Sequence, residues 1–556
     1  MEQKENIELE NNELGQKQDK KVENVNNKNK NTSKKKNTNK IYLILILLVV
    51  VLLAAFYLYY NNKNKDDSNK TKNGKTEYRS EYRMKGNSIE NFDLYFLKLE
   101  NEKENKVYSP LSIKYALGML AEGSRGDSKE QITSIIGDYE IKSYTNSKNM
   151  SFANAMFIGN AYKDSINKDF TDTLSSKYNA EIVFDDFKSA ENINSWVKSK
   201  TLGLIDSLLD QISSDTPFEL INALGIDMDW EEKFIRIPGA DYFYTYAHEK
   251  FSVKATGDIV SKTFEGLNKN IAGMEIAASI NNYDIVKTLG EDKIRKIVGD
   301  EYRKYLLDPE NAYDAEYILG GDTSSENLEK KINEYLDSYI ESINKNYKKT
   351  GKSTSFSLYT DDNIKAFSKD LKEYDGITLE YVAIMPQKES LDSYIKNIDS
   401  DKLNEVINSL KELKPENFKD GVVTKITGFI PRFKFEYKLN LKSDLESLGI
   451  KDVFDSNKSD LTGISSDKSF VIGNATHKAN IEFTQDGIKA AAASSAGGLG
   501  AGGGFDYSFD VPVEEIDLTF DKPYMFIIMD KNTKEVWFAG TVYEPLTWSK
   551  NLTYSE

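Results

Sequence analysis

The 556-residue chain contains no cysteine and only two histidines, His248 and His477. The absence of cysteine excludes disulfides, cysteine nucleophiles, thiolate zinc sites and a lipid-bearing lipoprotein cysteine. With only two histidines a multi-histidine metal site is nearly excluded, and any Ser-His nucleophile pair must use one of the two. The sequence therefore predicts a protein without a cofactor or metal, whose stability comes from packing alone.

Basic residues are outnumbered, because 73 Lys and Arg face 89 Asp and Glu and give a formal net charge of −16. Residues 1–40 carry ten Lys against seven acids, so the remainder of the chain is still more acidic. Such a body is a poor partner for nucleic acid or for a polyanion. Its 39% apolar and 12% aromatic residues are sufficient for a large core.

Charge is absent from residues 41–60, IYLILILLVVVLLAAFYLYY. As a helix rising 1.5 Å per residue, this run would span about 30 Å, which is the thickness of the hydrocarbon layer of a membrane. Three tyrosines cluster at its carboxyl end, where their polar tips suit the headgroup layer. We expect one transmembrane helix here.

The charges on either side of this run predict its orientation. Residues 28–40 carry six Lys and no acid, whereas residues 61–67 carry two Lys followed by two Asp. This bias places the amino terminus in the cytoplasm and the body outside the cell, as a single-pass protein of the cell membrane. A cleaved secretion signal is the alternative, but forty residues precede the run, which is also longer than a usual signal core.

The other segments differ in composition. Residues 1–40, rich in Lys and Asn, predict a disordered cytoplasmic tail, and residues 61–86 predict a polar linker. The globular domain is expected over residues 87–546, followed by a short tail at 547–556. The stretch from about 265 to 350 is rich in Lys, Asn, Tyr and Glu with helical spacing, which predicts an inserted helical segment.

Helical and strand patterns are interspersed along the globular domain. The segment from Ser88, SIENFDLYFLKLENE, and the segment from Ser109 to Gly123 predict helices, the second with Pro110 in its first turn. Strand-like runs begin at Ile430 and Val471, and two more lie near the carboxyl end. Because there is no regular βαβ rhythm, the fold class is α+β.

Residues 485–504, QDGIKAAAASSAGGLGAGGG, lie between two strand-like runs. A flexible linker accounts for the glycines after residue 496, but not for the four consecutive alanines. If the segment became a strand in a packed sheet, alternate residues would point to the core, and Lys489 would point to solvent. The core-facing residues would be Ile488, Ala490, Ala492 and Ser494, none of them charged. This pattern suits a strand that can switch between solvent and a sheet.

Residues 482–496, EFTQDGIKAAAASSA, resemble the hinge of the reactive loop in inhibitory serpins, the family of serine-protease inhibitors. Further segments resemble serpin signatures in the expected order: Ser109–Ile132, Phe152–Phe157, Ile193–Ile205, Leu220–Phe234, Ile430–Leu439, Leu445–Ser465, His477–Lys478, Phe520–Met529 and Phe538–Pro545. The resemblance to a membrane-anchored serpin of bacterial type implies a large, mostly antiparallel central sheet with surrounding helices. It also implies an exposed reactive-centre loop over residues 485–519.

The resemblance assigns roles to individual residues. The hinge would comprise Gly487, Ile488, Ala490, Ala491, Ala492 and Ala493. The hydrogen-bonded shutter of the central sheet and the point of loop entry would comprise Ser109, Ser112, Asn222, Trp230 and His477. Two departures are notable: Ile488 is bulkier than the Thr or other short residue usual in relatives, and Asp227 and Asp229 replace an apolar and a basic residue.

The bond cut by the protease follows from the usual length of the loop. Counting from Gly487 places Ala501 before the cut and Gly502 after it, which suits proteases with a small apolar specificity pocket. The segment up to Pro523 is about ten residues longer than relatives need, so other positions compete. These positions are Leu499, Phe505 and Tyr507.

The resemblance implies an irreversible suicide-substrate inhibitor, not an enzyme. The cut loop would insert into the central sheet and trap an extracellular serine or cysteine protease, elastase-like or subtilisin-like, as a covalent acyl-enzyme. The inhibitor would be a monomer with no nucleic-acid partner. The alternatives are a non-inhibitory serpin-fold protein that serves as a surface binding or structural module, and a surface hydrolase that uses His477.

Overall fold

The computed structural model describes residues 79–99, 102–236, 243–245, 262–346, 353–467, 470–473, 475–488, 505, 507 and 509–547. These residues belong to the second of two compact units, Tyr78–Glu556. The expected tails, linker start and membrane span at residues 41–60 lie outside them. Among the described residues, no helix has the length and apolar character needed to cross a bilayer.

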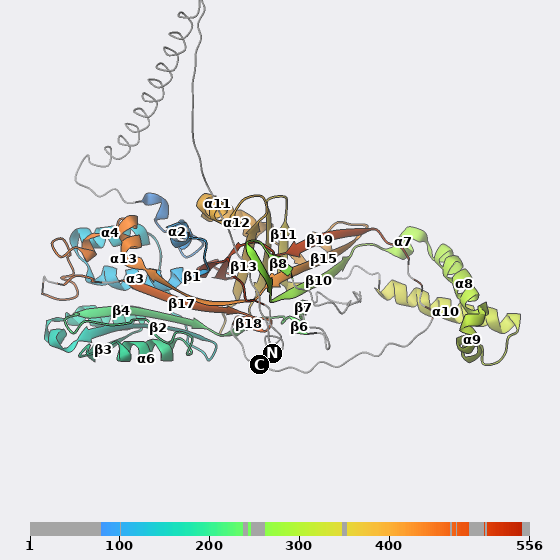
Figure 1. The fold of residues 1–556 in the computed structure, drawn as a ribbon, viewed down its shortest axis with the longest axis horizontal. Helices are drawn as coiled ribbons and strands as arrows, with labels where there is room; N and C mark the ends of the chain where they lie inside the picture. Colours follow the sequence, from blue (N-terminus) through green and yellow to red (C-terminus); the bar gives the residue numbers. More distant parts are fainter. Residues whose placement is uncertain are drawn as a thin grey trace, which may run out of the picture. The chain divides into compact units, whose positions relative to one another are not determined.

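Two sheets that lie next to each other at β4 and β17 are described together, and we call them the two parts of the split sheet. One part has the strand order β16 (Phe433–Asn440), β17 (Thr476–Phe483), β18 (Gly487–Ile488) and β5 (Met228–Asp229). The other part has the order β3 (Ala180–Asp185), β2 (Met150–Gly159) and β4 (Phe218–Ile226). Only Asp227 separates β4 from β5, so the two parts are continuous at this end. Figure 1 shows β4 beside β17.

Two further sheets complete most of the strand structure. The larger contains β1 (Lys106–Tyr108), β21 (Val536–Val542), β20 (Tyr524–Asp530), β13 (Leu379–Pro386), β12 (Ile364–Asp370), β11 (Ser353–Thr360) and β14 (Lys411–Leu413) in that order, with antiparallel neighbours throughout. The smaller contains β19 (Val513–Thr519), β15 (Val423–Pro431), β10 (Gly273–Asn281), β7 (Phe243–Thr245) and β6 (Ile235–Arg236). A hairpin of β8 (Lys262–Phe264) and β9 (Leu267–Ile271) precedes β10.

The helices pack around these sheets. They are α2 (Asn91–Leu99), α3 (Pro110–Gly123), α4 (Gly126–Ile136), α5 (Lys168–Tyr178), α6 (Glu191–Lys200), α11 (Leu391–Asn397), α12 (Ser400–Ser409) and α13 (Leu441–Leu448), with short 3-10 turns η2 (Ser80–Tyr82), η3 (Asn160–Ser165), η5 (Pro415–Asn417) and η6 (Asp452–Phe454). The helix predicted from Ser109 to Gly123 is confirmed as α3, because the Ser109 hydroxyl accepts from the Ser112 amide at 3.1 Å and Pro110 occupies the first turn.

Between β10 and β11 the chain forms a group of helices that we call the helical module, residues 285–346. It comprises α7 (Ile285–Leu289), α8 (Glu291–Leu307), η4 (Pro309–Asn311), α9 (Ala312–Leu319) and α10 (Ser325–Asn346). Its apolar residues form a buried cluster of their own, distinct from the main cluster of the body. These helices lie within the inserted segment predicted from about residue 265 to 350, but the predicted helical structure begins only at Ile285. Residues 273–281 alternate inward and outward as β10, with Met274, Ile276 and Ile280 buried.

The body also begins before the expected boundary at residue 87. Met84 is fully buried, its amide donates to the Ile135 carbonyl at 2.9 Å, and its own carbonyl accepts from the Asp138 amide at 3.0 Å. A single methionine among polar neighbours gives too weak a sequence pattern to reveal this contact.

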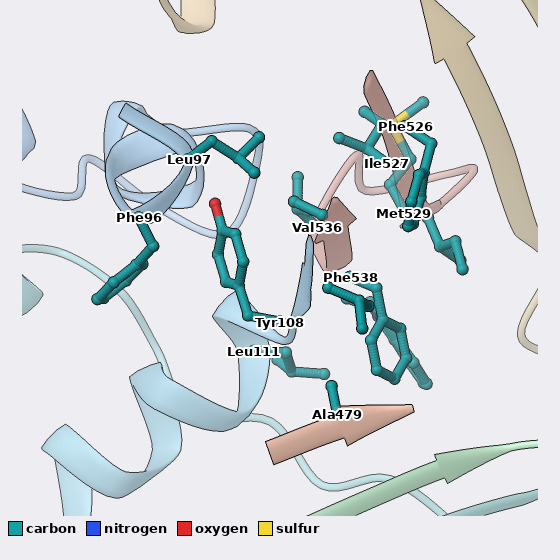
Figure 2. Close-up of a cluster of buried hydrophobic side chains, with 14 of the residues drawn as sticks. Phe96, Leu97, Tyr108, Leu111, Ala479, Phe526, Ile527, Met529, Val536 and Phe538 are labelled. Atoms are coloured by element: carbon teal, nitrogen blue, oxygen red, sulfur yellow. The ribbon is translucent and has the colours of Figure 1, made fainter. Parts of the chain in front are cut away.

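The main core lies between the split sheet, the seven-stranded sheet and helices α2 and α3. Figure 2 shows side chains from several of these elements gathered in one cluster: Phe96, Leu97, Tyr108, Leu111, Ala479, Phe526, Ile527, Met529, Val536 and Phe538. The Tyr108 hydroxyl points toward α2 and donates to the Asp93 carbonyl at 2.5 Å. Beside it, the carboxylate of Asp93 pairs with Lys114 at 2.7 Å, and both side chains are fully buried. This core fixes one face of β17, which borders the candidate site.

Candidate functional site

The boundary between β4 and β17 is open, and we call it the seam. Each strand is paired on its outer side, β4 with β2 and β17 with β16. Over the described part of the chain, no hydrogen-bonded ladder joins β4 to β17 along their facing sides. A strand edge without a partner exposes donors and acceptors that another strand can take.

The short strand β18 occupies one end of the seam. Ile488 is paired with Phe483 of β17 on one side and with Met228 of β5 on the other, while Gly487 is paired with Asp229. The Ile488 side chain is 2% exposed and belongs to the main core. The first residues of the predicted hinge thus form a strand between β17 and β5, and β5 continues the direction of β4 beyond Asp227.

Glycine is required at position 487 by close packing rather than by backbone conformation. A Cβ atom added there would lie 2.2 Å from the Met228 carbonyl oxygen and 2.7 Å from the Asp229 Cα. Both are backbone atoms, which cannot rotate away as a side chain can. Only a residue without a side chain lets β18 approach β5 this closely.

Trp230 and Phe234 hold the chain that leads into β18. The Trp230 amide donates to the Asp486 carbonyl and its indole nitrogen donates to the Thr484 carbonyl, both at 2.9 Å. The Phe234 amide donates to the Gln485 carbonyl at 3.0 Å. Three successive hinge carbonyls are therefore satisfied by one short segment, which fixes where β18 begins.

A charged triad lies beside this entry point. Lys233 lies 3.3 Å from a carboxylate oxygen of Asp229 and 3.7 Å from one of Asp486. Burial raises the pKa of Asp486, while the positive charge of Lys233 opposes this rise. Asp229, noted as a departure from the family pattern, therefore has a basic partner four residues later that the sequence analysis did not identify.

Three cavities follow the seam in order from Ile488. The first, of about 20 Å³, is lined by Ile488, Ile226 and Ile481 among others. The second, of about 50 Å³, lies beside His477, and the third, of about 800 Å³, extends past Leu220 to Thr476 and Leu441. The three cavities lie one after another along β4, from Ile226 to Phe218, and along the facing part of β17.

The predicted shutter residues line the second cavity together. They are Ser109, Ser112, Asn222 and His477. The Ser109 amide donates to Nε2 of His477 at 2.9 Å. Asn222 is not bonded to His477; its amide nitrogen donates to Oδ1 of Asn154 at 2.8 Å, and its own Oδ1 is buried without a partner among the described residues. The seam thus contains an acceptor that an added strand could satisfy.

His477 is a neutral structural histidine. Burial lowers its pKa to about 4, because no anionic side chain compensates the desolvation of the imidazolium. Nε2 must be unprotonated to accept from the Ser109 amide. These features give no support to a role as a general base for hydrolysis. Within the residues that the structure describes, no group of three or more His, Asp or Glu side chains could hold a metal ion.

The connection between α6 and β4, residues 201–217, covers the seam. The Asn480 side chain donates to the Leu204 carbonyl at 3.1 Å, and Lys438 pairs with Asp210 at 2.9 Å. Ile205 lines the first two cavities. The sequence analysis missed this cover, because contacts between segments nearly 280 residues apart have no local pattern.

The remaining predicted site residues divide into two groups. The alanines of the hinge and the predicted bond between Ala501 and Gly502 lie outside the described residues, as does the competing Leu499. Phe505 and Tyr507 are described, and both pack against the helical module. The predicted reactive-centre loop of residues 485–519 therefore begins and ends within sheets, at β18 and at β19.

Comparisons with known proteins extend over most of the chain. The family model described as serpin (serine protease inhibitor) matches residues 91–255 and 352–545. Iripin-1 of Ixodes ricinus is 23% identical over 471 residues, which cover 79% of this chain and 89% of that protein. Leukocyte elastase inhibitor of Bos taurus is 26% identical over 475 residues, covering 82% and 97%. Among solved structures, native tengpin, a thermophilic serpin, has a TM-score of 0.52 at 21% identity, covering 84% of this chain and 99% of its own.

Proposed function

Because the chain belongs to the serpin family, whose model matches well over half of its length, we propose that it inhibits proteases as a suicide substrate. The relatives named above include an elastase inhibitor. In the proposed reaction the protease cuts the reactive-centre loop, and the cut loop then enters the seam and traps the enzyme. The target is a serine protease, or a cysteine protease, with a small apolar specificity pocket.

The observation that carries this proposal is the open seam with β18 already paired at one end. The two pairings of Ile488 provide a template from which further residues can add, one after another, between β4 and β17. In an inserted strand, every second residue after Ile488 would point to the core, as Ile488 does. These residues are Ala490, Ala492 and Ser494, which are small enough to fit beside His477 and Asn222.

The proposed chemistry uses the protease's own catalytic residues. Its serine attacks the Ala501 carbonyl, the bond to Gly502 breaks, and the new amino terminus at Gly502 leaves with the proton that the protease's histidine supplies. Ala501 then remains joined to the serine as an ester. From Gly487 to Ala501 are fourteen steps, so full insertion would carry the bound protease roughly 45 Å. Distortion of its oxyanion hole at the far end of the sheet would leave the ester unhydrolysed.

We also propose that the inhibitor acts at the outer surface of a bacterial cell membrane. Residues 41–60 would anchor it and the charge bias around them would place the body outside. Digestion of intact cells tests this placement: an externally added protease should remove the body while a cytoplasmic marker remains intact. Protection of the body would overturn the orientation and leave the inhibitory function untouched.

The inhibitory function is tested with the full-length chain in detergent. On mixing with an elastase-like or a subtilisin-like protease, we expect a covalent complex that survives denaturing gel electrophoresis. Ala492→Pro removes a hydrogen-bond donor from the inserted strand and should be cut without forming this complex. Ala492→Ser is the matched control and should still form it. Cleavage without complex by every protease tested would favour a non-inhibitory serpin-fold protein instead.

A further inference from the structure

The helical module has a feature that loop insertion alone does not require: it binds the segment that follows the predicted cut. Its own core is formed by buried residues of α7, α8, α9 and α10. Three aromatic residues from outside the module, Phe505, Tyr507 and Phe509, pack against this core. We call residues 505–512, which lead from this contact to β19, the carboxyl arm of the loop.

Phe505 lies in a pocket of tyrosines. Its ring centroid is 4.9 Å from that of Tyr302, 5.2 Å from that of Tyr305 and 5.6 Å from that of Tyr335. These are distances at which aromatic rings attract one another. The Tyr335 hydroxyl also donates to the Phe505 carbonyl at 3.4 Å. Both the side chain and the carbonyl of Phe505 are thus engaged by α8 and α10.

A second contact follows two residues later. The Tyr339 hydroxyl donates to the Tyr507 carbonyl at 2.8 Å, and the Tyr507 ring lies 5.0 Å from that of Phe509. Tyr335 and Tyr339 are one helical turn apart on α10, so they present their hydroxyls on the same side.

The carboxyl arm is also fixed at its other end. The Val423 amide donates to the Pro512 carbonyl at 2.8 Å, and β19 is paired in parallel with β15 from Val513 to Thr519. In the same sheet β15 is paired with β10, from which the chain passes through residues 282–284 into α7. The sheet that holds β19 therefore also carries the module, so the arm is attached at both ends to one structure.

We propose that the helical module is a specificity-determining clamp for the reactive-centre loop. It holds Phe505 and Tyr507 on the body, so that a protease can cut only on the amino side of Phe505. It also keeps the uncut loop from entering the seam, because the carboxyl arm would have to leave both the tyrosines and β15. The claim that the module prevents insertion of the uncut loop rests on the proposed function. The claim that the module restricts where a protease can cut does not.

The first part has a direct chemical reason. A protease binds its substrate as an extended chain, with the side chain before the cut in its specificity pocket and the carbonyl in its oxyanion hole. In Phe505 the ring and the carbonyl are both occupied by the module, and in Tyr507 the carbonyl is occupied. A protease that prefers aromatic residues must therefore detach the arm before it can cut there.

Mapping of the cut sites in the full-length chain tests the clamp. A chymotrypsin-like protease should cut the wild type on the amino side of Phe505, with Leu499 as the expected site. The double variant Tyr335→Ala, Tyr339→Ala should be cut after Phe505 and Tyr507 at least ten times faster than the wild type. Tyr313→Ala is the matched control, because this tyrosine of the same module is 84% exposed; it should behave as the wild type.

Two further measurements distinguish a loosened clamp from an unfolded module. Tyr339→Phe removes only the hydroxyl that donates to Tyr507 and should raise cutting after Tyr507 without altering the helical circular dichroism. On prolonged incubation, the double variant should also lose inhibitory activity at least ten times faster than the wild type, without being cut. Equal cutting after Phe505 in wild type and double variant would overturn the clamp, whereas the absence of any covalent complex would overturn only the proposed function.

Discussion

The seven-stranded sheet and the split sheet border the same core, yet one is closed and the other is open. In the seven-stranded sheet, β13 is paired with β12 on one side and with β20 on the other, and every residue of β13 is buried. In the split sheet, among the described residues, β4 has no partner along the seam and β17 has one only at Phe483, which is paired with Ile488 of β18. Apolar residues of both sheets belong to one core cluster.

The strands on either side of the seam also contribute apolar residues to the core. They are Ile221, Leu224 and Ile226 of β4 and Ile481 and Phe483 of β17. What the split sheet lacks among the described residues is a ladder of hydrogen bonds between β4 and β17, and cavities lie beside both strands. In the proposed mechanism, the free energy released by insertion would therefore come from forming hydrogen bonds at this one seam.

Insertion of the cut loop into the seam should have the largest effect on the stability of the protein. When the loop is cut by a protease that is then removed, the split sheet should gain a strand and come to resemble the seven-stranded sheet. We expect the melting temperature of the cut chain to rise by roughly 10 °C or more, which differential scanning calorimetry would detect. The cut Ala492→Pro variant serves as the control and should show little rise. Identical melting of cut and uncut wild type would remove the basis for insertion.

Ile488→Arg should prevent the insertion of the loop at β18, where insertion is proposed to begin. The guanidinium would replace a side chain that is 2% exposed, and burying an unpaired charge costs several kcal/mol. The variant should become a substrate that is cut without a stable covalent complex, which the stoichiometry of inhibition would measure. Ile488→Val keeps an apolar side chain and should inhibit nearly as well as the wild type. Full inhibition by the Arg variant would show that insertion does not begin at β18.

Acidification should weaken the split sheet through His477. Its pKa is lowered from 6.5 in the unfolded chain to about 4 in the folded protein. Its contribution to stability is therefore complete above pH 6.5 and is lost as the pH falls toward 4. The maximal loss is about 3 kcal/mol, at about 1.4 kcal/mol for each pH unit. Urea unfolding of the wild type and of His477→Gln, which does not titrate, should show this difference.

The comparison with His477→Gln is necessary because other buried groups titrate in the opposite sense. Burial raises the pKa of Glu219, which lines the largest seam cavity, to about 7, and that of Asp93 to about 6. Both carboxyls favour the folded state as the pH falls through these values. Since they are present in both proteins, their contributions cancel in the difference. An identical pH dependence of the two proteins would contradict the role given to His477.

Gly487→Ala should change the stability of the protein least among these variants. The added methyl group would overlap the Met228 carbonyl, so β18 must shift or leave the sheet, at a cost of about 1–3 kcal/mol. Hydrogen exchange of the Met228 and Ile488 amides would report this loosening. Gly473→Ala is the matched control, because a Cβ atom there meets nothing within 4 Å. Unchanged exchange in the Gly487 variant would mean that the close approach of β18 to β5 is not maintained in solution.

Much of this architecture could be predicted from local patterns in the sequence. The helix from Ser109 to Gly123 was recognisable because its capping residue, its first-turn proline and its apolar spacing agree. The serpin family was recognisable from an ordered series of motifs, and the family comparison confirms it. The resemblance also named Ser109, Ser112, Asn222 and His477, which line one cavity.

Other features depend on contacts that leave no local signal. The pairing of Lys233 with Asp229 and Asp486, and the cover formed by residues 201–217, join segments that only the fold brings together. Phe505 and Tyr507 appeared as competing cut positions because the loop is about ten residues longer than relatives need. Their contact with Tyr335 and Tyr339 arises from a helical module whose partner could not be read from its own amphipathic pattern.

The separate core of the helical module has a consequence for how the sequence of this protein can change. A unit that enters from β10 and returns to β11, with its own buried residues, can accumulate substitutions without disturbing the residues beside β4 and β17. If the module is the proposed clamp, preference for a different protease could therefore evolve, or be engineered by replacing the module, without changing the residues proposed to take part in insertion.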